Sequence, residues 1–327
     1  MFGTDFININ CALAFFLSFI LSLALYPFLI RWLKKQNVRS QGHVDHLIDA
    51  STKLEKEKTP SFGGALFVFI PFLAPVLFFP DLPFIFYPLL LSTLLFAGVG
   101  LLDDLFKIWH PARGISAKAK SFGQIAASLS FLFFIPCNTL HVPFLGDFLI
   151  AGYWMIPFIL FLLFVMVGTS NAVNLTDGMD GLAGSLSLVS YLFLCIFALL
   201  EGQSFLACMI ASCLGALLAF TYFNRKPAKI FMGDIGSLPL GGLIAAFAIL
   251  LRQEFLLILL GGMFVVETVS VMIQVAYYKR TRRRIFACAP LHHHYQSKGW
   301  TEQGIVANFL VWQFAFSFIG LIIYILC

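Results

Sequence analysis

Long apolar segments alternate with short polar ones along the whole chain. An α-helix needs about 17–25 predominantly apolar residues to cross a bilayer core of about 30 Å. The sequence predicts ten such helices, at 11–32, 62–80, 84–102, 121–137, 149–168, 182–200, 204–223, 236–251, 255–277 and 304–326. The second window contains three prolines, so we expect an irregular helix there. The pattern therefore predicts an all-α fold with about ten transmembrane helices in a single membrane domain over residues 1–327.

Composition supports a membrane protein and excludes an ordinary soluble domain. Hydrophobic residues make up 60% of the chain, charged residues only 11%, and the mean hydropathy is +0.91. The seven cysteines are scattered and include no CxxC pair, so neither a disulfide framework nor a zinc site is expected.

The basic residues predict the orientation of the chain in the membrane. Of the 21 lysines and arginines, 20 fall in the segments 31–58, 103–120, 224–235 and 278–300, and only Arg252 lies on the other face. Because basic loops are retained on the cytoplasmic side, we expect these segments inside and both termini outside. The net charge of +5 is then a sign of topology, and we expect no nucleic-acid partner. Basic loops would attract anionic lipid headgroups and phosphorylated substrates.

Four polar clusters fall on this predicted cytoplasmic face. Charged groups are costly at membrane depth and need a reason to be there. The clusters are "DDLFK" with Asp103, Asp104 and Lys107; "NAVNLTDGMDG" with Asn171, Asn174, Asp177 and Asp180; "FMGDIGS" with Asp234; and "PLHHHY" with His292, His293 and His294. Together they predict an active-site cleft at this face.

Each cluster also has a purely structural explanation. The paired aspartates could bind the lysine one helical turn on, the Asn-Asp-Gly loop could be turn chemistry, and Asp234 could cap the next helix. Three consecutive histidines point in different directions and cannot easily bind one ion. Four independent caps on one side of one membrane are nevertheless harder to explain than one shared site.

The chemistry that unites these residues is the handling of phosphates at a membrane. Magnesium binds through one or two carboxylates together with substrate phosphates, so Asp234, set between two glycines, is the predicted ligand of Mg²⁺. Lysines can neutralise phosphoryl oxygens, and histidines can donate hydrogen bonds to a diphosphate. The membrane setting predicts that one substrate is a lipid.

The same strings resemble a known family. "LLDDLFK", "NAVNLTDGMDGLA", "PAKIFMGDIGSLPLGG" and "PLHHHYQSKGW" look like the motifs of the phospho-N-acetylmuramoyl-pentapeptide transferases, within the polyprenyl-phosphate N-acetylhexosamine-1-phosphate transferase superfamily. The resemblance begins at "KTPSFGG" (58–64) and reaches the last span. One departure is Tyr295, where the family pattern has phenylalanine.

The resemblance implies an activity and a set of partners. Family members transfer phospho-N-acetylmuramoyl-pentapeptide from a UDP-linked donor to undecaprenyl phosphate, releasing UMP and forming the first lipid intermediate of peptidoglycan synthesis. They require Mg²⁺. A bacterial cytoplasmic (inner) membrane location is implied, and a homodimer is compatible with the resemblance.

The resemblance also implies roles for single residues. Asp234 matches the magnesium ligand, Asp103 and Asp104 match the paired aspartates beside Lys107, and Phe231 looks like the aromatic that stacks on uracil. The loop near nucleotide and phosphates and the histidine motif near the diphosphate correspond to Asn171, Asn174, Asp177, Asp180, His292, His293 and His294. Lys118, and one of Lys56 or Lys58, look like substrate-contacting lysines. Glu267 and Gln274 lie on one helix face and either line the cleft or form internal hydrogen bonds.

Two other functions are compatible with parts of the pattern. A related enzyme using another UDP-N-acetylhexosamine would keep the aspartates but differ around the histidines. A proton-coupled transporter would also hold intramembrane acids, yet its acids should lie near mid-span, whereas these lie at one interface.

Overall fold

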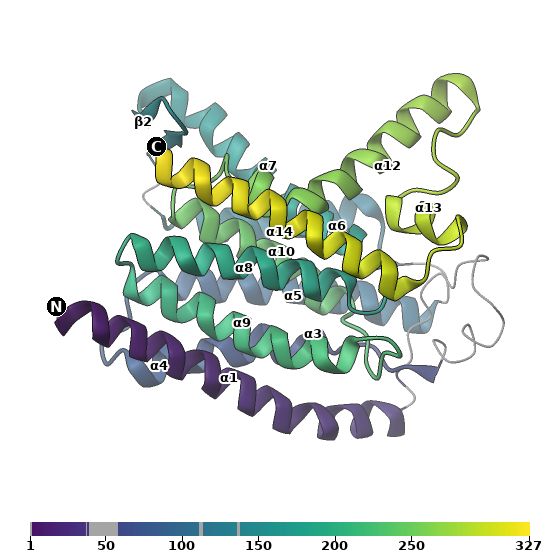
Figure 1. The fold of residues 1–327 in the computed structure, drawn as a ribbon, viewed down its shortest axis with the longest axis horizontal. Coiled ribbons are helices and arrows are strands. Elements are labelled where there is room, and N and C mark those ends of the chain that lie inside the picture. Colours follow the sequence, from purple (N-terminus) through teal and green to yellow (C-terminus); the bar gives the residue numbers. More distant parts are fainter. Residues whose placement is uncertain (1, 37, 39–57, 111–113, 136–137) are drawn as a thin grey trace.

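The computed structural model describes residues 2–36, 38, 58–110, 114–135 and 138–327. The chain is built from helices, apart from one short hairpin (Figure 1). The helices are α1 (Phe2–Lys35), α3 (Gly64–Phe69), η1 (Ile70–Phe72), α4 (Leu73–Phe78), α5 (Phe86–Trp109), α6 (Ala117–Leu132), η2 (Gly152–Trp154), α7 (Met155–Thr176), α8 (Leu182–Leu200), α9 (Ser204–Asn224), α10 (Asp234–Leu250), α11 (Leu257–Leu260), α12 (Gly262–Thr281), α13 (Leu291–Ser297) and α14 (Glu302–Leu326). The predicted helical class is confirmed.

Each of the ten predicted windows overlaps a helical segment, but the segments differ in their capacity to span a bilayer. In the part of the chain that the structure describes, six helices are long and apolar enough to cross a membrane: α1, α5, α7, α8, α9 and α14. The segment Gly64–Phe78 and helix α10 are apolar but shorter. Helix α6 has 16 residues, and α12 contains Glu267 and ends in basic residues.

Helix α10 forms the centre of the molecule. Every residue from Asp234 to Ile249 is buried, and α10 packs against α5, α7, α8 and α3. A helix that is apolar on all sides is stable only when other elements surround it. The ends of α10 are therefore fixed relative to the helices around it.

The peripheral helices present apolar side chains outward. Helix α1 packs along α9, where Ser18 and Ser212 share a buried hydrogen bond of 2.5 Å. Its outer face exposes Phe16 and Trp32, and α14 exposes Val311. Large apolar side chains exposed along whole helices are suited to contact with lipid.

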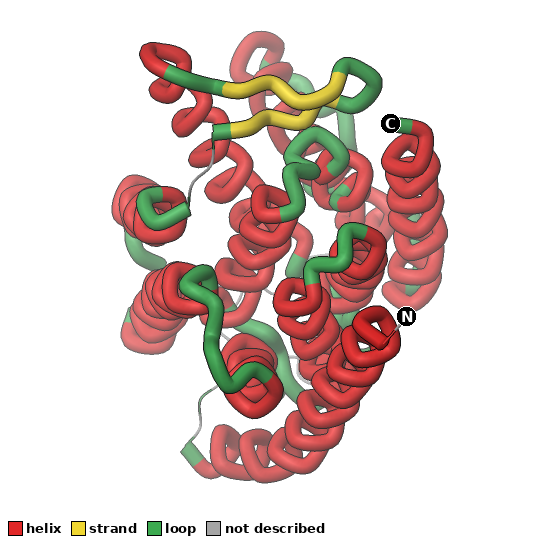
Figure 2. Tube along the Cα trace, turned by 90° about the vertical axis from the view of Figure 1, so that its left-hand side faces the viewer, coloured by secondary structure: helices red, strands yellow, loops and turns green. Residues whose placement is uncertain are grey.

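The two ends of the helical body differ. The N- and C-termini lie at the same end of the body as the hairpin formed by β1 (Thr139–Val142) and β2 (Gly146–Leu149), and the C-terminus is the nearer of the two to it (Figures 1 and 2). The strands are antiparallel, with Thr139 opposite Leu149 and Val142 opposite Gly146. Helix α13 lies at the opposite end, and α12 projects away from the body to reach it (Figure 1). The hairpin is an addition to the predicted all-α fold.

Candidate active site

Five polar side chains from four helices meet at one end of α10. Lys107 Nζ of α5 lies 2.9 Å from Asp103 Oδ2 and 3.0 Å from Asp234 Oδ2. Lys120 Nζ of α6 lies 3.3 Å from the same Asp103 oxygen and 2.5 Å from the same Asp234 oxygen. Asn174 of α7 accepts from Lys120 at 3.1 Å and donates to Asp234 Oδ1 at 3.0 Å. We call these five side chains the carboxylate–ammonium cluster.

Backbone packing fixes the position of Asp234. Gly233 has φ +72°, a conformation that favours glycine, and it turns the chain into α10. Gly100 of α5 lies directly against the backbone of Asp234, where any side chain would collide. Asp104 Oδ2 accepts a hydrogen bond of 3.0 Å from the Ile235 amide. Asp104 therefore caps α10 from a neighbouring helix, and Asp234 itself points into the cluster.

Asp103 connects the cluster to the start of α6. Its Oδ1 accepts from the Ile115 amide at 2.8 Å, while its Oδ2 faces both ammonium groups. Lys118 lies on the exposed side of the same helix, whereas Lys120 is partly buried. The structure thus brings Lys120 into the cluster and leaves Lys118, the lysine expected from the sequence, on the outer face.

The loop between α7 and α8 borders the cluster. Burial raises the pKa of the Asp177 carboxyl well above its ordinary value, and the nearby carboxylates of Asp234 and Asp104 raise this pKa further. Asp180 accepts from the Ala228 amide at 3.1 Å, which joins this loop to the segment before α10. Both loop aspartates thus lie beside the predicted metal ligand or the segment that carries it.

The histidine motif reaches the same loop from the other side. His292 is fully buried; its Nδ1 lies 2.9 Å from Glu267 Oε2, and its amide donates to Glu267 Oε1 at 3.1 Å. His292 Nε2 has no hydrogen-bond partner among the residues described. It faces Gly178, where an added Cβ would lie 2.5 Å from His292 Nε2 and 3.4 Å from His293 Nε2. Glu267 thus holds His292 with its second nitrogen directed at the Asp177 loop.

The remaining residues of this region have supporting contacts. His294 Nδ1 accepts from the Ala287 amide at 3.1 Å, away from the other two histidines. Gln274 bonds the backbone of Ile285 and Phe286, so it holds the loop before α13. Glu267 therefore orients a histidine of the candidate site, whereas Gln274 forms internal hydrogen bonds that hold a loop.

Three further predicted residues lie outside the cluster itself. Phe231 is half-buried, and its backbone pairs with Pro60 and Gly63. Asn171 donates to Gln124 Oε1 at 3.2 Å, one helical turn from the cluster. Lys58 is exposed, and Lys56 lies outside the described residues.

Known proteins resemble this chain over most of its length. The model of glycosyl transferase family 4 matches residues 86–252. Phospho-N-acetylmuramoyl-pentapeptide-transferases of Chlamydia trachomatis serovar L2, Desulforamulus reducens and Chlamydia muridarum are 38%, 39% and 40% identical to it, each over 94% of this chain and 96%, 93% and 96% of the relative.

The chain belongs to the phospho-N-acetylmuramoyl-pentapeptide transferase family. The family-4 match includes the whole carboxylate–ammonium cluster but ends before α12 and α13. The histidine motif and Glu267 are therefore covered by the full-length relatives alone.

The residues present fit a magnesium ion of the kind expected for this transferase family. No three histidine, cysteine, aspartate or glutamate side chains among the described residues converge as metal ligands. However, Asp234 Oδ2 and Asp103 Oδ2 both contact the same two ammonium groups, so they favour a positive charge between them. Magnesium takes one or two carboxylates and completes its shell with phosphates and water. The donor set suits such a site and does not form an all-protein cage.

Sequence reasoning missed several residues that the structure places in or near the site. Lys120, Gln124 and Ser128 are spaced four residues apart on the buried face of α6, and this spacing could have selected Lys120 over Lys118. Asn224 accepts from the Gly181 amide and donates to the Ile230 carbonyl, both at 2.9 Å. No local pattern distinguishes Asn224, because its partners lie in two separate loops.

Proposed function

We propose that this chain transfers phospho-N-acetylmuramoyl-pentapeptide from its UDP-linked donor to undecaprenyl phosphate, releasing UMP. The observation that carries the proposal is the carboxylate–ammonium cluster bordered by the Asp177 loop and by His292. Membership of the transferase family supports the two substrates. The cluster offers the charge that phosphates require, and the long apolar helices α5 and α7 that carry part of it suit a lipid acceptor.

The proposed reaction is a direct displacement. An oxygen of the lipid phosphate attacks the donor phosphorus that carries the sugar, a new phosphoanhydride bond forms, and the bond to UMP breaks. A phosphate monoester has a second pKa of about 6, so most of the acceptor is already a dianion at neutral pH. The attack therefore needs positioning and charge neutralisation more than a general base.

The side chains of the cluster supply that positioning in the proposed mechanism. Lys107 and Lys120, now paired with carboxylates, can turn to phosphoryl oxygens and neutralise them. Asn174 fixes the carboxylate of Asp234 through its amide. His292, held by Glu267 through Nδ1, can donate from Nε2 to a diphosphate oxygen on the loop side when both ring nitrogens carry a proton. His293, Asp177 and Asp180 border the same space, and Phe231 is proposed to stack on uracil.

We further propose that Mg²⁺ binds at Asp234 with Asp103 beside it. Asp234 and Asp103 would hold the ion, and its chemistry there would be to supply positive charge to the phosphates of the donor. Lys107 and Lys120 would then move from the carboxylates to the substrate.

The membrane arrangement is part of the proposal. Ten crossings, six of them through the long apolar helices, would leave both termini outside and the cluster at the cytoplasmic face of the bacterial inner membrane. Both termini lie at one end of the body (Figure 1), and this supports an even number of crossings. The site would then meet a soluble UDP-linked donor from the cytoplasm and a lipid acceptor from the bilayer.

Donor competition tests the proposed substrate. Purified enzyme with undecaprenyl phosphate and Mg²⁺ should consume a fluorescent UDP-N-acetylmuramoyl-pentapeptide, and excess UDP-N-acetylglucosamine should leave the rate unchanged. Turnover of labelled UDP-N-acetylglucosamine in place of the muropeptide donor would contradict the proposal and favour a related sugar-phosphate transferase. His292→Ala should reduce turnover of the muropeptide donor strongly, and Ser297→Ala, at the exposed end of α13, serves as its control.

A further inference from the structure

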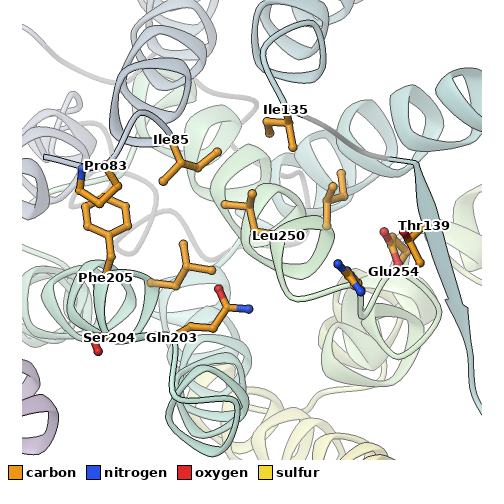
Figure 3. A pocket seen from close by; sticks show the side chains of 12 residues that line it. Pro83, Ile85, Ile135, Thr139, Gln203, Ser204, Phe205, Leu250 and Glu254 are labelled. Atoms are coloured by element: carbon orange, nitrogen blue, oxygen red, sulfur yellow. The ribbon is translucent and has the colours of Figure 1, made fainter. Parts of the chain in front are cut away.

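A pocket lies at the end of the molecule opposite the candidate active site (Figure 3). Helix α10 begins at Asp234 in the carboxylate–ammonium cluster and ends at Leu250 in the wall of this pocket. At 1.5 Å per residue, these two positions are about 24 Å apart, close to the thickness of a bilayer core. The pocket is therefore separate from the candidate active site, and in the proposed membrane arrangement it would lie at the opposite interface.

The pocket has one apolar and one polar side. Its volume is about 430 Å³, within the range of small-molecule sites. Figure 3 shows Pro83, Ile85, Ile135 and Leu250 on one side. The polar side chains lining it come from β1, from the start of α9 and from the turn after α10: Thr139, Gln203, Ser204, Arg252 and Glu254. A cavity of this kind suits an amphiphile with a short polar head.

Glu254 is a buried acidic residue of the pocket with one carboxylate oxygen left without a partner in the described part of the chain. Its side chain is 4% exposed, and Oε2 has no hydrogen-bond partner among the residues the structure describes. A buried carboxylate oxygen without a partner destabilises the protein. Burial raises the pKa of this carboxyl to about 7, although Arg252 lowers it. A donor carrying a positive charge would satisfy this oxygen.

Arg252 places a positive charge beside that carboxyl. Its guanidinium is 58% exposed and its NH1 lies 3.6 Å from Asp147 Oδ2, itself 53% exposed. An ion pair this exposed contributes little, so a phosphate could replace Asp147 at low cost. Arg252 has φ +53°, and the turn after α10 presents it next to the buried Glu254.

We propose that this pocket binds a phospholipid whose headgroup carries a primary ammonium, with its phosphate on Arg252, its ammonium on Glu254 and the start of a chain against the apolar side. A purely anionic headgroup would place negative charge beside Glu254. A quaternary ammonium has no N–H to donate to Oε2. The pairing of one exposed cation with one buried, unpaired anion therefore selects phosphatidylethanolamine over phosphatidylglycerol and phosphatidylcholine.

Native mass spectrometry of the purified protein tests this site. The protein is titrated in detergent with phosphatidylethanolamine, phosphatidylglycerol or phosphatidylcholine of identical chains, and the bound lipid is counted. Glu254→Gln keeps the shape and removes the charge, so it should weaken phosphatidylethanolamine binding on the order of tenfold. Binding of phosphatidylcholine should stay within twofold, and binding of phosphatidylglycerol should stay the same or rise, because its repulsion by Glu254 is lost.

Two further variants control the result. Asp81→Asn makes the same change of charge at an exposed position outside the pocket lining and should leave all three lipids unaffected. Arg252→Gln changes an exposed side chain, so it should fold even if Glu254→Gln does not, and it should also weaken phosphatidylethanolamine binding. Equal phosphatidylethanolamine binding by wild type and Arg252→Gln, or a wild-type preference for phosphatidylglycerol, would overturn the proposal.

Discussion

At the scale of single residues, Asp103, Asp104 and Asp234 have different partners. Asp104 accepts from the first amides of α10, and Asp103 faces two ammonium groups and the Ile115 amide. Asp234 Oδ2 shares both ammonium groups with Asp103. Asp234 also accepts from a side-chain amide, that of Asn174, a geometry suited to holding a cation in one place.

Asp234→Asn should abolish most of the activity while leaving the fold intact. The change keeps the size of the side chain but removes the charge that both lysines and the proposed Mg²⁺ share, so turnover should fall on the order of 10²-fold or more. The measurement is initial rate against Mg²⁺ concentration, with size-exclusion chromatography to check folding. Near-normal turnover at low Mg²⁺ would mean that Asp234 is only the first residue of α10 and does not bind the ion.

Lys120→Gln and Lys118→Gln form a matched pair on one helix. Lys120 donates to two carboxylates and an amide, whereas Lys118 is exposed. Loss of such charge-assisted bonds should reduce kcat/KM by about 10- to 100-fold for Lys120→Gln, and Lys118→Gln should stay within about threefold. The reverse order would assign the substrate contact to Lys118.

Residue types could be predicted more easily than residue geometry. Asp103, Lys107, Asn174 and Asp234 were all expected from their motifs, and the structure brings them together. The role of Asp104 as a cap could not be predicted, because its partner is the Ile235 amide 131 positions away.

At the scale of elements, the site depends on the contact between α5 and α10. Gly100 allows α5 to touch the backbone of Asp234, and Gly64 similarly touches Gly236. Small residues allow helices to approach closely in membrane proteins. The glycines around Asp234 thus serve backbone packing, in addition to any freedom they give the turn.

Gly100→Ala and Gly98→Ala separate packing from helix propensity. The new methyl at 100 would collide with the Asp234 carbonyl, whereas nothing lies within 4 Å of the one at 98. Overpacking costs about 1–3 kcal/mol, so Gly100→Ala should lower the melting temperature and displace Asp234, with at least tenfold lower turnover. Gly98→Ala, which gains helix propensity without a collision, should match or slightly exceed wild type in melting temperature and match it in activity. Equal behaviour of the two variants would show that this contact does not position the site.

The sequence predicted where helices lie better than how they cross the membrane. Window 182–200 coincides with α8, because apolar length alone defines a buried helix of that kind. Window 62–80 became α3, η1 and α4, since its prolines interrupt the regular hydrogen bonds. The hairpin was missed because its eight strand residues pair only with each other.

At the scale of the whole molecule, the candidate active site and the Glu254 pocket lie at opposite ends of the helical body. The cluster and α13 lie at one end, and the termini, the hairpin and the Glu254 pocket lie at the other (Figures 1 and 3). The charge bias of the loops predicts which end faces the cytoplasm. The charge bias is a pattern of the whole chain, so it could be interpreted from the sequence alone. The pocket could not be predicted in this way, because its lining comes from five separate segments.

Thiol accessibility tests this orientation. In a background without the seven native cysteines, Arg284→Cys and Lys298→Cys should resist a membrane-impermeant maleimide in intact cells. Asp81→Cys and Asp147→Cys, at the other end, should be labelled readily. All four positions are exposed. A cysteine that does not react is therefore shielded from the reagent by the membrane and not by burial within the protein. Ready labelling at 284 or 298 would reverse the predicted topology.

The released nucleotide tests the central claim most directly. Direct attack on the sugar-linked phosphorus breaks the phosphoanhydride bond and releases UMP, whereas transfer of the sugar alone would break the bond to the sugar carbon and release UDP. Purified enzyme should be incubated with UDP-N-acetylmuramoyl-pentapeptide, undecaprenyl phosphate and Mg²⁺, and the nucleotides separated by chromatography. The account predicts UMP in equal amount to a new lipid diphosphate, and both products formed on the order of 10²-fold more slowly by Asp234→Asn. Release of UDP, or of UMP without lipid product, would contradict it.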